Sequence, residues 1–187
     1  SHNGLADVDV VITTRELARM IKEAGIDFPN LPDEDFDSLL GESTGASVIF
    51  GATGGVMEAA LRTAYNMITG KELEQVDLTA VRGVEGVKEA SVQVGDLTVN
   101  VAVANGTANA AKLLAQVRSG EKQYHFIEVM GCPGGCVTGG GQPIVSAQKR
   151  MECDPRAVRA AALYREDANK PLRRSHENPE IKALYAD

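Results

Sequence analysis

The stretch VQVGDLTVNVAV (92–103) carries the clearest structural signal in the chain. Apolar and polar residues alternate on both sides of Gly95-Asp96, as in two strands joined by a two-residue turn. We therefore predict a β-hairpin here. A helix from about Asn105 to Val117 and a strand from Tyr124 to Met130 are predicted to follow it.

The helix after the hairpin has an apolar stripe at helical spacing. It is predicted to turn Leu113, Leu114 and Val117 inward, and Gly120 is predicted to end it. Two more helices are predicted in the last third of the chain. They begin at Asp154-Pro155 and at Asn178-Pro179, since a capping side chain followed by proline is typical of a first helical turn.

Two strand–helix units are predicted before the hairpin. The β-branched run at 8–12 is interpreted as a buried strand, followed by a helix that begins at Thr13 and that Gly25 ends. Thr13 and Glu16 have the spacing of a capping box.

The second unit combines an apolar run at 47–50, interpreted as a strand, with a helix that Gly70 ends. The acidic segment at 29–37 lies between the two units, and we expect a solvated surface there, with a docking patch as the alternative. Strands that alternate with helices predict an α/β fold: a mostly parallel sheet flanked by helices, with one β-hairpin.

Composition narrows the classes of function. The chain has 187 residues, of which 43% are apolar, and a formal net charge of −7. An acidic chain is a poor nucleic-acid binder and a poor ligand for an anionic membrane surface, because both need positive charge. No apolar run approaches the roughly 20 residues that span a bilayer. Ser1-His2 is interpreted as an expression-tag remnant and excluded from the domain, which is taken as residues 3–187.

The segment EVMGCPGGCVTGGGQP (128–143) is the best candidate for chemistry. Its glycines allow the backbone to approach a bulky ligand closely, and successive N–H groups in such a loop suit an iron–sulfur cluster. Cys132 and Cys136 are the thiols of this loop. An inert pair of thiols or a labile disulfide is the alternative.

Other thiol chemistry fits less well. The spacing C-x-x-x-C is not that of a thioredoxin-type pair, and no second pair of ligands completes a zinc site. A cubane cluster takes four cysteines and the chain has three, the third being Cys153, so a further ligand would be needed.

The segment Gly51–Gly55 leads from an apolar run into a helix. It matches neither common glycine-rich nucleotide motif. The local pattern supports two interpretations equally: a tight turn with Thr53 as the helix cap, and an anion site at the helix N-terminus.

Four stretches together resemble the catalytic domain of [FeFe] (iron-only) hydrogenases. They are DVDVVITTRELARMIKEAGI (7–26), IFGATGGVMEAALRT (49–63), YHFIEVMGCPGGCVTGGGQP (124–143) and LYREDANKPLRRSHENPEIKALY (163–185). The resemblance implies one lobe of the H-cluster domain, with residues 3–187 as the C-terminal portion of a large subunit that interconverts H₂ with protons and electrons.

The resemblance also implies site roles. The H-cluster is a [4Fe–4S] cubane joined to a di-iron subsite. Cys132 and Cys136 match the third and fourth cubane cysteines, with Cys136 bridging to the di-iron unit. Met130 and Phe50 match residues that line the di-iron pocket, whereas Cys153 matches no ligand position. The family's first two cysteine motifs are not in this sequence, so we expect this chain alone to bind no cluster and to be inactive.

The partners implied by the resemblance are the N-terminal part of the same domain, ferredoxin or another electron carrier, and hydrogenase maturation proteins. Neither nucleic acid nor a membrane is expected as a partner. The cytoplasm is the expected compartment, with the periplasm as the alternative. The alternative functions are a hydrogenase-like iron–sulfur assembly scaffold and a sensory protein without H₂ turnover.

Overall fold

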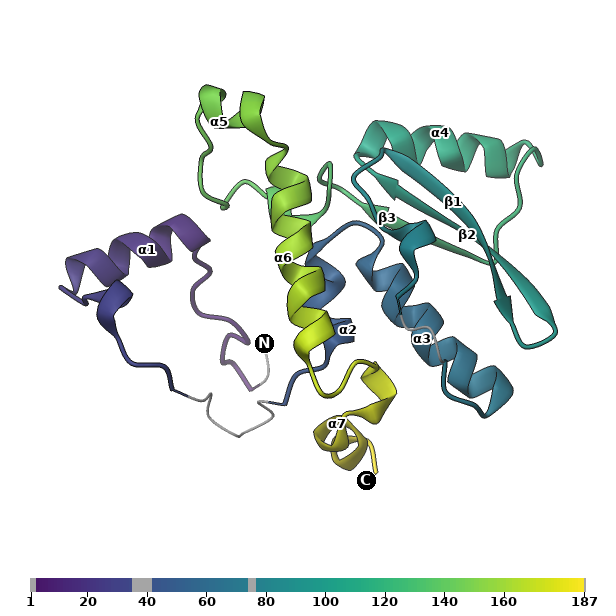
Figure 1. The fold of residues 1–187 in the computed structure, drawn as a ribbon, viewed down its shortest axis with the longest axis horizontal. Helices are drawn as coiled ribbons and strands as arrows, with labels where there is room; N and C mark the ends of the chain where they lie inside the picture. The colour runs from purple at the N-terminus through teal and green to yellow at the C-terminus, as the bar shows by residue number, and fades with distance from the viewer. Residues whose placement is uncertain (1–2, 35–41, 74–76, 187) are drawn as a thin grey trace.

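A computed structural model describes residues 3–34, 42–73 and 77–186 (Figure 1). Both residues of the expected tag remnant and residues 35–37 of the acidic segment lie outside this range. In the described ranges the helices are α1 (Thr14–Glu23), α2 (Gly45–Val48), α3 (Gly55–Thr69), α4 (Thr107–Arg118), α5 (Ala147–Glu152), α6 (Pro155–Asn169) and α7 (Pro179–Leu184). The strands are β1 (Val87–Val94), β2 (Leu97–Asn105) and β3 (Phe126–Met130).

The predicted hairpin is confirmed. β1 and β2 pair antiparallel with Val94 opposite Leu97, and Gly95 in the turn has φ +61°, a conformation that favours glycine. β3 then pairs parallel to β2, so the sheet order is β1-β2-β3. The fold class is α/β, as predicted, and the described sheet contains one antiparallel and one parallel pairing.

Two predicted strands are wrong, which is why the sheet has fewer parallel strands than expected. Residues 47–50 form the end of α2 and a 3₁₀ turn over Ile49–Gly51, because the Thr44 side chain accepts from Ser47 N–H and starts a helix. A run of four apolar residues fits a buried helix as well as a buried strand. Residues 8–12 form no strand and are exposed, with Val11 86% exposed.

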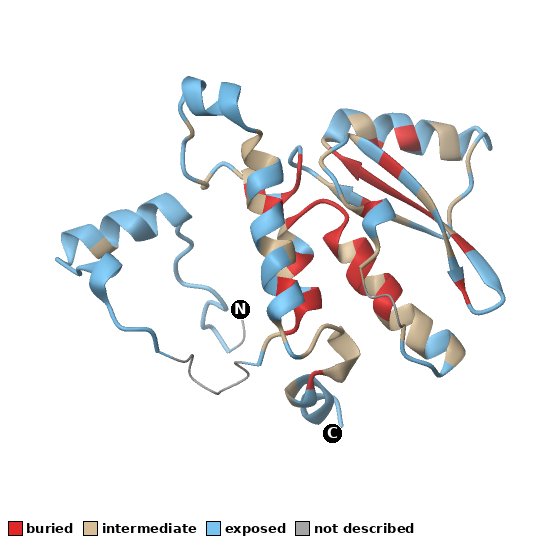
Figure 2. Ribbon diagram, in the orientation of Figure 1, coloured by how far each residue is buried: buried red, intermediate tan, exposed pale blue. Residues whose placement is uncertain are grey.

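The core lies on both faces of the sheet. α3 packs on one face through a cluster made of Met57, Leu61, Val81, Val94, Val99, Val101 and Val103. α4 packs on the other face through Ala102, Ala104, Ala110 and Leu113 (Figures 1 and 2). The prediction that Leu113 turns inward is confirmed, that for Leu114 is wrong because its side chain is exposed, and Val117 is half-buried.

Most predicted helix ends are confirmed. Thr13 and Glu16 form the capping box of α1, and Asp154 and Asn178 cap α6 and α7. α3 ends at Gly70, whose φ is +67°. Local side-chain-to-backbone bonds fix these ends, so they can be read from a few neighbouring residues.

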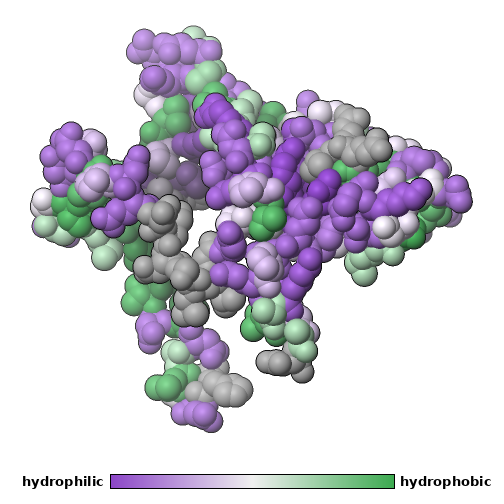
Figure 3. Space-filling model, turned by 60° about the horizontal axis from the view of Figure 1, so that its bottom comes forward, coloured by the Kyte–Doolittle hydropathy of each residue, from purple (hydrophilic) through white to green (hydrophobic). Residues whose placement is uncertain are grey.

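α1 differs from the other long helices because no residue in it is buried (Figure 2). Leu17 and Met20 lie exposed on one side of α1, and charged side chains lie on its other side. Hydrophobic and hydrophilic residues are therefore mixed at the left of Figure 3, where α1 lies. Residues 29–34 of the acidic segment are also exposed. No helix in the described ranges is long and apolar enough to cross a membrane.

Candidate functional site

The cysteine loop begins where β3 ends. Cys132 and Cys136 are both exposed free thiols, and a short 3₁₀ turn begins at Cys136. β2 ends beside β3, and the N–H of Gly106 donates to the carbonyl of Met130 at 2.8 Å. The loop therefore lies at the carboxyl ends of two parallel strands, which is where α/β proteins usually bind their ligands.

Two glycines allow this loop to touch the segment that precedes α3. Gly134 and Gly135 have φ +88° and +97°. A Cβ on Gly135 would lie 2.7 Å from Thr53 N and 2.8 Å from Gly51 O, so only glycine fits there. Glycine therefore permits a close backbone approach at this position, and the partner is protein backbone; the predicted approach to a bulky ligand stays a prediction.

The middle of the loop is held from two sides. The N–H of Gly134 donates to Asn105 Oδ1 at 2.9 Å, and its carbonyl accepts from Thr53 N–H at 3.1 Å. From the α6 side, Arg159 donates to the carbonyls of Val137 at 2.9 Å and Pro143 at 2.7 Å. These bonds come from three separate elements, so the loop is positioned by the whole fold.

Phe50 and Met130 lie on the two segments that meet here. Phe50 belongs to the 3₁₀ turn before Gly51–Gly55 and is 45% exposed, while Met130 is the half-buried last residue of β3. The Thr53–Gly134 hydrogen bond brings the Phe50 segment and the cysteine loop together. Cys153 lies after α5, outside the loop, and its Sγ lies 3.5 Å from the carbonyl of Lys149.

The helix after Gly51–Gly55 is capped by a distant carboxylate, which corrects the prediction for Thr53. Gly54 is the N-cap of α3, and the N–H groups of Gly54 and Met57 donate to Glu128 at 2.6 and 2.7 Å. Thr53 Oγ1 is buried without a hydrogen-bond partner among the described residues. A buried carboxylate at a helix N-terminus is stabilised by the free N–H groups and the helix dipole. The interpretation of Thr53 as the helix cap is therefore wrong. The place of the anion in the other interpretation is taken by the Glu128 carboxylate, which is a protein side chain and not a ligand.

Lys88, on strand β1, binds the segment Gly51–Gly55 from the side of the sheet. It is 8% exposed, and its Nζ donates to the carbonyls of Thr53 and Gly83, both at 2.9 Å. Burial lowers the pKa of Lys88 to about 8, although the nearby charges of Glu128 and Glu85 raise it. Sequence reasoning missed Lys88, Glu128 and Asn105. The one available signal was a charged residue inside the apolar strand FIEVM.

A second buried cluster of charges joins α3 to α6. Arg62 is fully buried and donates to both carboxylate oxygens of Asp167, at 2.9 and 2.8 Å, and to Glu58 at 2.7 Å. Glu58, Asp77 and Asp167 lie close enough to share a metal ion, but the guanidinium groups of Arg62, Arg82 and Arg173 already bind them. We therefore interpret this cluster as a structural cross-link.

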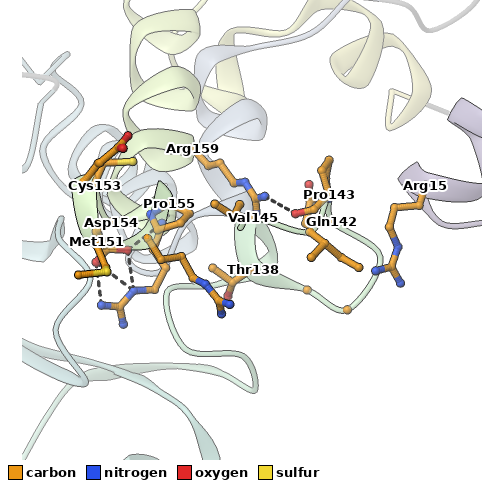
Figure 4. Close-up of a pocket in the computed structure, with 16 residues that line it drawn as sticks. Arg15, Thr138, Gln142, Pro143, Val145, Met151, Cys153, Asp154, Pro155 and Arg159 are labelled. Carbon is orange, nitrogen blue, oxygen red and sulfur yellow. Dashed lines mark hydrogen bonds and ion pairs between the residues drawn. The ribbon is translucent and has the colours of Figure 1, made fainter. Parts of the chain in front are cut away.

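An arginine-rich hollow of about 780 Å³ adjoins the cysteine loop (Figure 4). Its wall includes Thr138 and Pro143 from the loop, the start of α6, and Arg15 from α1. Its charged lining residues are Arg15, Arg150, Arg156 and Arg159 against Glu152 and Asp154. This wall is locally positive although the chain as a whole carries a net charge of −7.

Two free thiols on a glycine-rich loop at the ends of parallel strands suit an α/β domain that holds a soft metal. Residues 1–140 match the family described as iron only hydrogenase large subunit, C-terminal domain, and residues 153–187 match the family described as iron hydrogenase small subunit. The chain belongs to the family of iron-only hydrogenase large subunits. The resemblance inferred from the sequence is confirmed.

Relatives agree with this assignment. The chain is 56% identical to an NADP-reducing hydrogenase subunit of Solidesulfovibrio fructosivorans, covering 99% of this chain and 31% of that protein. It is 57% identical to a periplasmic [Fe] hydrogenase large subunit of Nitratidesulfovibrio vulgaris, covering 76% and 34%. A cytosolic iron–sulfur assembly component of Pongo abelii is more distant, at 32% identity over 96% and 37%. The chain thus spans about a third of the length of these relatives.

A solved structure gives the same result for the fold. An [FeFe]-hydrogenase from Chlamydomonas reinhardtii superposes with a TM-score of 0.70 and 42% identity, covering 95% of this chain and 50% of that one. The fold described above is therefore similar to that of one half of this [FeFe]-hydrogenase chain.

Proposed function

We propose that this chain is part of an [FeFe]-hydrogenase that interconverts H₂ with protons and electrons, and that Cys132 and Cys136 supply two of the four cubane cysteines. The observation that supports the proposal most is the cysteine loop. Both thiols are exposed and free at the carboxyl ends of β2 and β3, in a chain that belongs to the hydrogenase family.

The residues present fit a share of the H-cluster. Thiolates are the ligands that iron–sulfur clusters prefer, and Cys132 and Cys136 lie exposed and free on one short loop. When bound, the H-cluster supplies the iron chemistry that forms or splits H₂. In this proposal Cys132 and Cys136 hold the cubane, while Met130 and Phe50 present apolar surface that excludes water from the di-iron subsite.

Two matched thiols are too few for a cubane, so this chain alone is expected to be inactive and without a cluster. The other half of the domain is the proposed partner. The exposed apolar side chains of residues 8–12 and of α1 support this proposed partner, because monomeric proteins rarely leave contiguous apolar surface uncovered. Hydrogenase maturation proteins, which would deliver the di-iron subsite, are a further proposed partner.

Electrons must enter or leave near the cubane, and the arginine-rich hollow of Figure 4 is a suitable place for the carrier to dock. An acidic carrier such as ferredoxin would be attracted to its guanidinium groups, and this attraction would weaken with salt. The hollow shares Thr138 and Pro143 with the cysteine loop, so a carrier bound there would lie close to the proposed ligands. We also propose a cytoplasmic location, on the basis of three free thiols; a periplasmic relative represents the alternative.

Serine substitutions in the intact hydrogenase test the proposal. Cys136→Ser should abolish H₂ turnover and lower the iron content after anaerobic maturation, because it removes a cluster thiolate. Cys153→Ser is the matched control. Because Cys153 also lines the proposed docking hollow, turnover is measured with a small artificial electron donor, and both quantities should stay nearly unchanged. Equal losses in the two variants would contradict the ligand assignment. A wild-type protein that matures with iron but never turns over H₂ would favour the assembly or sensory alternative instead.

A test of the ligand count uses this chain alone. Anaerobic reconstitution followed by iron and sulfide analysis should yield no stoichiometric cubane and no H₂. A complete cubane with turnover from these 187 residues would refute the proposal that half of the ligands come from elsewhere.

A further inference from the structure

We propose that Asn105 is a positioning residue for the Cys132–Cys136 pair, because its carboxamide fixes the peptide group at the centre of the loop between them. The inference rests on the proposed function only in assuming that the two thiols bind metal together. Asn105 is neither a cysteine-loop residue nor adjacent to one in sequence.

The hydrogen bond from Asn105 reaches the loop at its midpoint. Gly134 stands two residues after Cys132 and two before Cys136, and its N–H donates to Asn105 Oδ1 at 2.9 Å. The loop's own bonds lie on either side: Gly135 N–H donates to the Cys132 carbonyl at 3.0 Å, and Gly139 N–H donates to the Cys136 carbonyl at 2.9 Å. Asn105 therefore anchors the peptide on which the relative placement of both thiols depends.

Such an anchor is needed because of the glycines. Gly134 and Gly135 both have positive φ, and glycine has the widest choice of alternative backbone conformations. External hydrogen bonds restrict the arrangements of the two thiols that the loop can sample. At Gly134 these are the bond of its N–H to Asn105 Oδ1 and the bond of its carbonyl to Thr53 N–H, and Asn105 supplies the one made by a side chain. A loop that is already ordered loses less entropy when it binds.

Asn105 is itself held in one orientation. It is 2% exposed at the end of β2, its backbone N–H donates to the Gly86 carbonyl at 2.9 Å, and its Nδ2 donates to the Glu85 carbonyl. Since the amide nitrogen is used by Glu85, the amide oxygen faces Gly134. Asn105 also pairs in register with Met130, so the same residue links both strand ends to the loop.

Cadmium titration of this chain tests the inference without the H-cluster. In a Cys153→Ser background, Cd²⁺ binding by Cys132 and Cys136 can be followed by thiolate-to-metal charge-transfer absorbance. Asn105→Ala should weaken Cd²⁺ binding by about 10–100-fold, the usual effect of removing a group that orients metal ligands. Amide exchange at Gly134, measured by NMR, should become faster in the same variant.

Asn105→Asp separates positioning from general destabilisation. The aspartate keeps an acceptor for Gly134 N–H but loses the donor to Glu85, so it should be less stable than wild type yet bind Cd²⁺ nearly as well. Asn109→Ala is the matched control, because Asn109 donates to the Asn105 carbonyl at 2.8 Å and makes no described hydrogen bond to the loop. It should leave Cd²⁺ affinity unchanged.

Two results would overturn the inference: a folded Asn105→Ala variant with wild-type Cd²⁺ affinity and Gly134 exchange, or an Asn105→Asp variant that loses as much affinity as Asn105→Ala. Failure of the proposed function would give a different result in the Cd²⁺ titration. If neither Cys132→Ser nor Cys136→Ser alters Cd²⁺ binding, the thiols do not act as a pair, and the exchange rate at Gly134 alone then decides whether Asn105 anchors the loop.

Discussion

Glu128, on the strand that leads into the cysteine loop, accepts a 2.6 Å hydrogen bond from the backbone N–H of Gly54, the N-cap of α3. The same carboxylate accepts from Met57 N–H at 2.7 Å. One side chain thus connects the end of the sheet to the start of the helix that follows the Phe50 segment. The two segments proposed to line the cluster pocket share this support.

Glu128→Gln should destabilise the fold. The amide keeps the shape but loses the charge that interacts with the helix N-terminus, and one of its two ends donates rather than accepts. We expect a loss of about 1–3 kcal/mol in the free energy of unfolding, measured by urea denaturation. Glu23→Gln, at the exposed end of α1, is the control and should change it by less than about 0.5 kcal/mol. Equal effects of the two substitutions would contradict a capping role for Glu128.

Lys88 should make stability depend on pH in an alkaline window. Its folded-state pKa of about 8 lies below the value of about 10.4 in an unfolded chain. Between these values the unfolded chain binds more protons at this site than the folded chain, so the free energy of unfolding should rise with pH. Lys88→Met should abolish this increase in the free energy of unfolding, which is at most about 3 kcal/mol.

The measurement is a set of urea denaturation curves from pH 7 to pH 10.5. The difference between wild type and Lys88→Met should vary with pH. Lys112→Met, on the exposed side of α4, is the matched control for the loss of a lysine. A constant difference for Lys88→Met would show that Lys88 titrates alike in the folded and unfolded chain.

Local signals account for the part of the fold that the sequence predicts. The hairpin, the capping box at Thr13 and the starts of α6 and α7 each depend on residues within a few positions of one another. Runs 8–12 and 47–50 were predicted wrongly because a short apolar run does not specify its partner. Whether it becomes a strand depends on which element lies beside it.

The candidate site also has a part that the sequence predicts and a part that it does not. The glycine-rich loop with Cys132 and Cys136 could be found from its composition, because unusual residues gather within a few positions. Glu128 meets Gly54 across 74 positions of sequence, and Asn105 meets Gly134 across 29. No spacing rule on one sequence predicts such contacts, so the residues that support the loop emerge only from the fold.

Asp167→Asn should be strongly destabilising. Burial alone would raise the pKa of Asp167, but the hydrogen bonds from Arg62 and Arg173 outweigh it, so the pKa is lowered. The substitution leaves the fully buried Arg62 short of a countercharge, and we expect a loss of about 3–5 kcal/mol at neutral pH.

The pH dependence checks the cause. A carboxyl group with a lowered pKa stabilises the fold above its unfolded-chain pKa of about 3.9, and this stabilisation is lost as the pH falls through its folded-state pKa. The difference in the free energy of unfolding between wild type and Asp167→Asn should therefore become smaller below about pH 4. Glu166→Gln is the control on the same helix, where the carboxylate lies 3.4 Å from Lys170 at the surface. It should cost less than about 1 kcal/mol.

Cleavage of the chain at α5 should leave the two pieces associated. The large-subunit match ends at residue 140 and the small-subunit match begins at 153, and α5 between them contains no buried residue. The second piece stays bound in our interpretation through Asp167, through Arg159, and through the Leu172 carbonyl, which accepts from Gly45 N–H at 2.7 Å. A protease site placed within α5 should give two fragments that co-elute in gel filtration; separate elution would contradict this.

Met130→Leu tests the proposed pocket from its apolar side. Met130 ends β3 opposite Asn105, is half-buried, and stands two residues before Cys132. A methionine that only fills core should tolerate leucine at a cost below about 1.5 kcal/mol, with no specific effect. If its thioether borders the di-iron subsite, the variant of the intact hydrogenase should keep its fold and its iron content but turn over H₂ more slowly. The infrared bands of the cluster's CO and cyanide ligands should shift as well, because they respond to the atoms that surround them. Met57→Leu, in the core between α3 and the sheet, is the matched control and should leave the bands in place. Unshifted bands and wild-type turnover in Met130→Leu would return Met130 to a packing role.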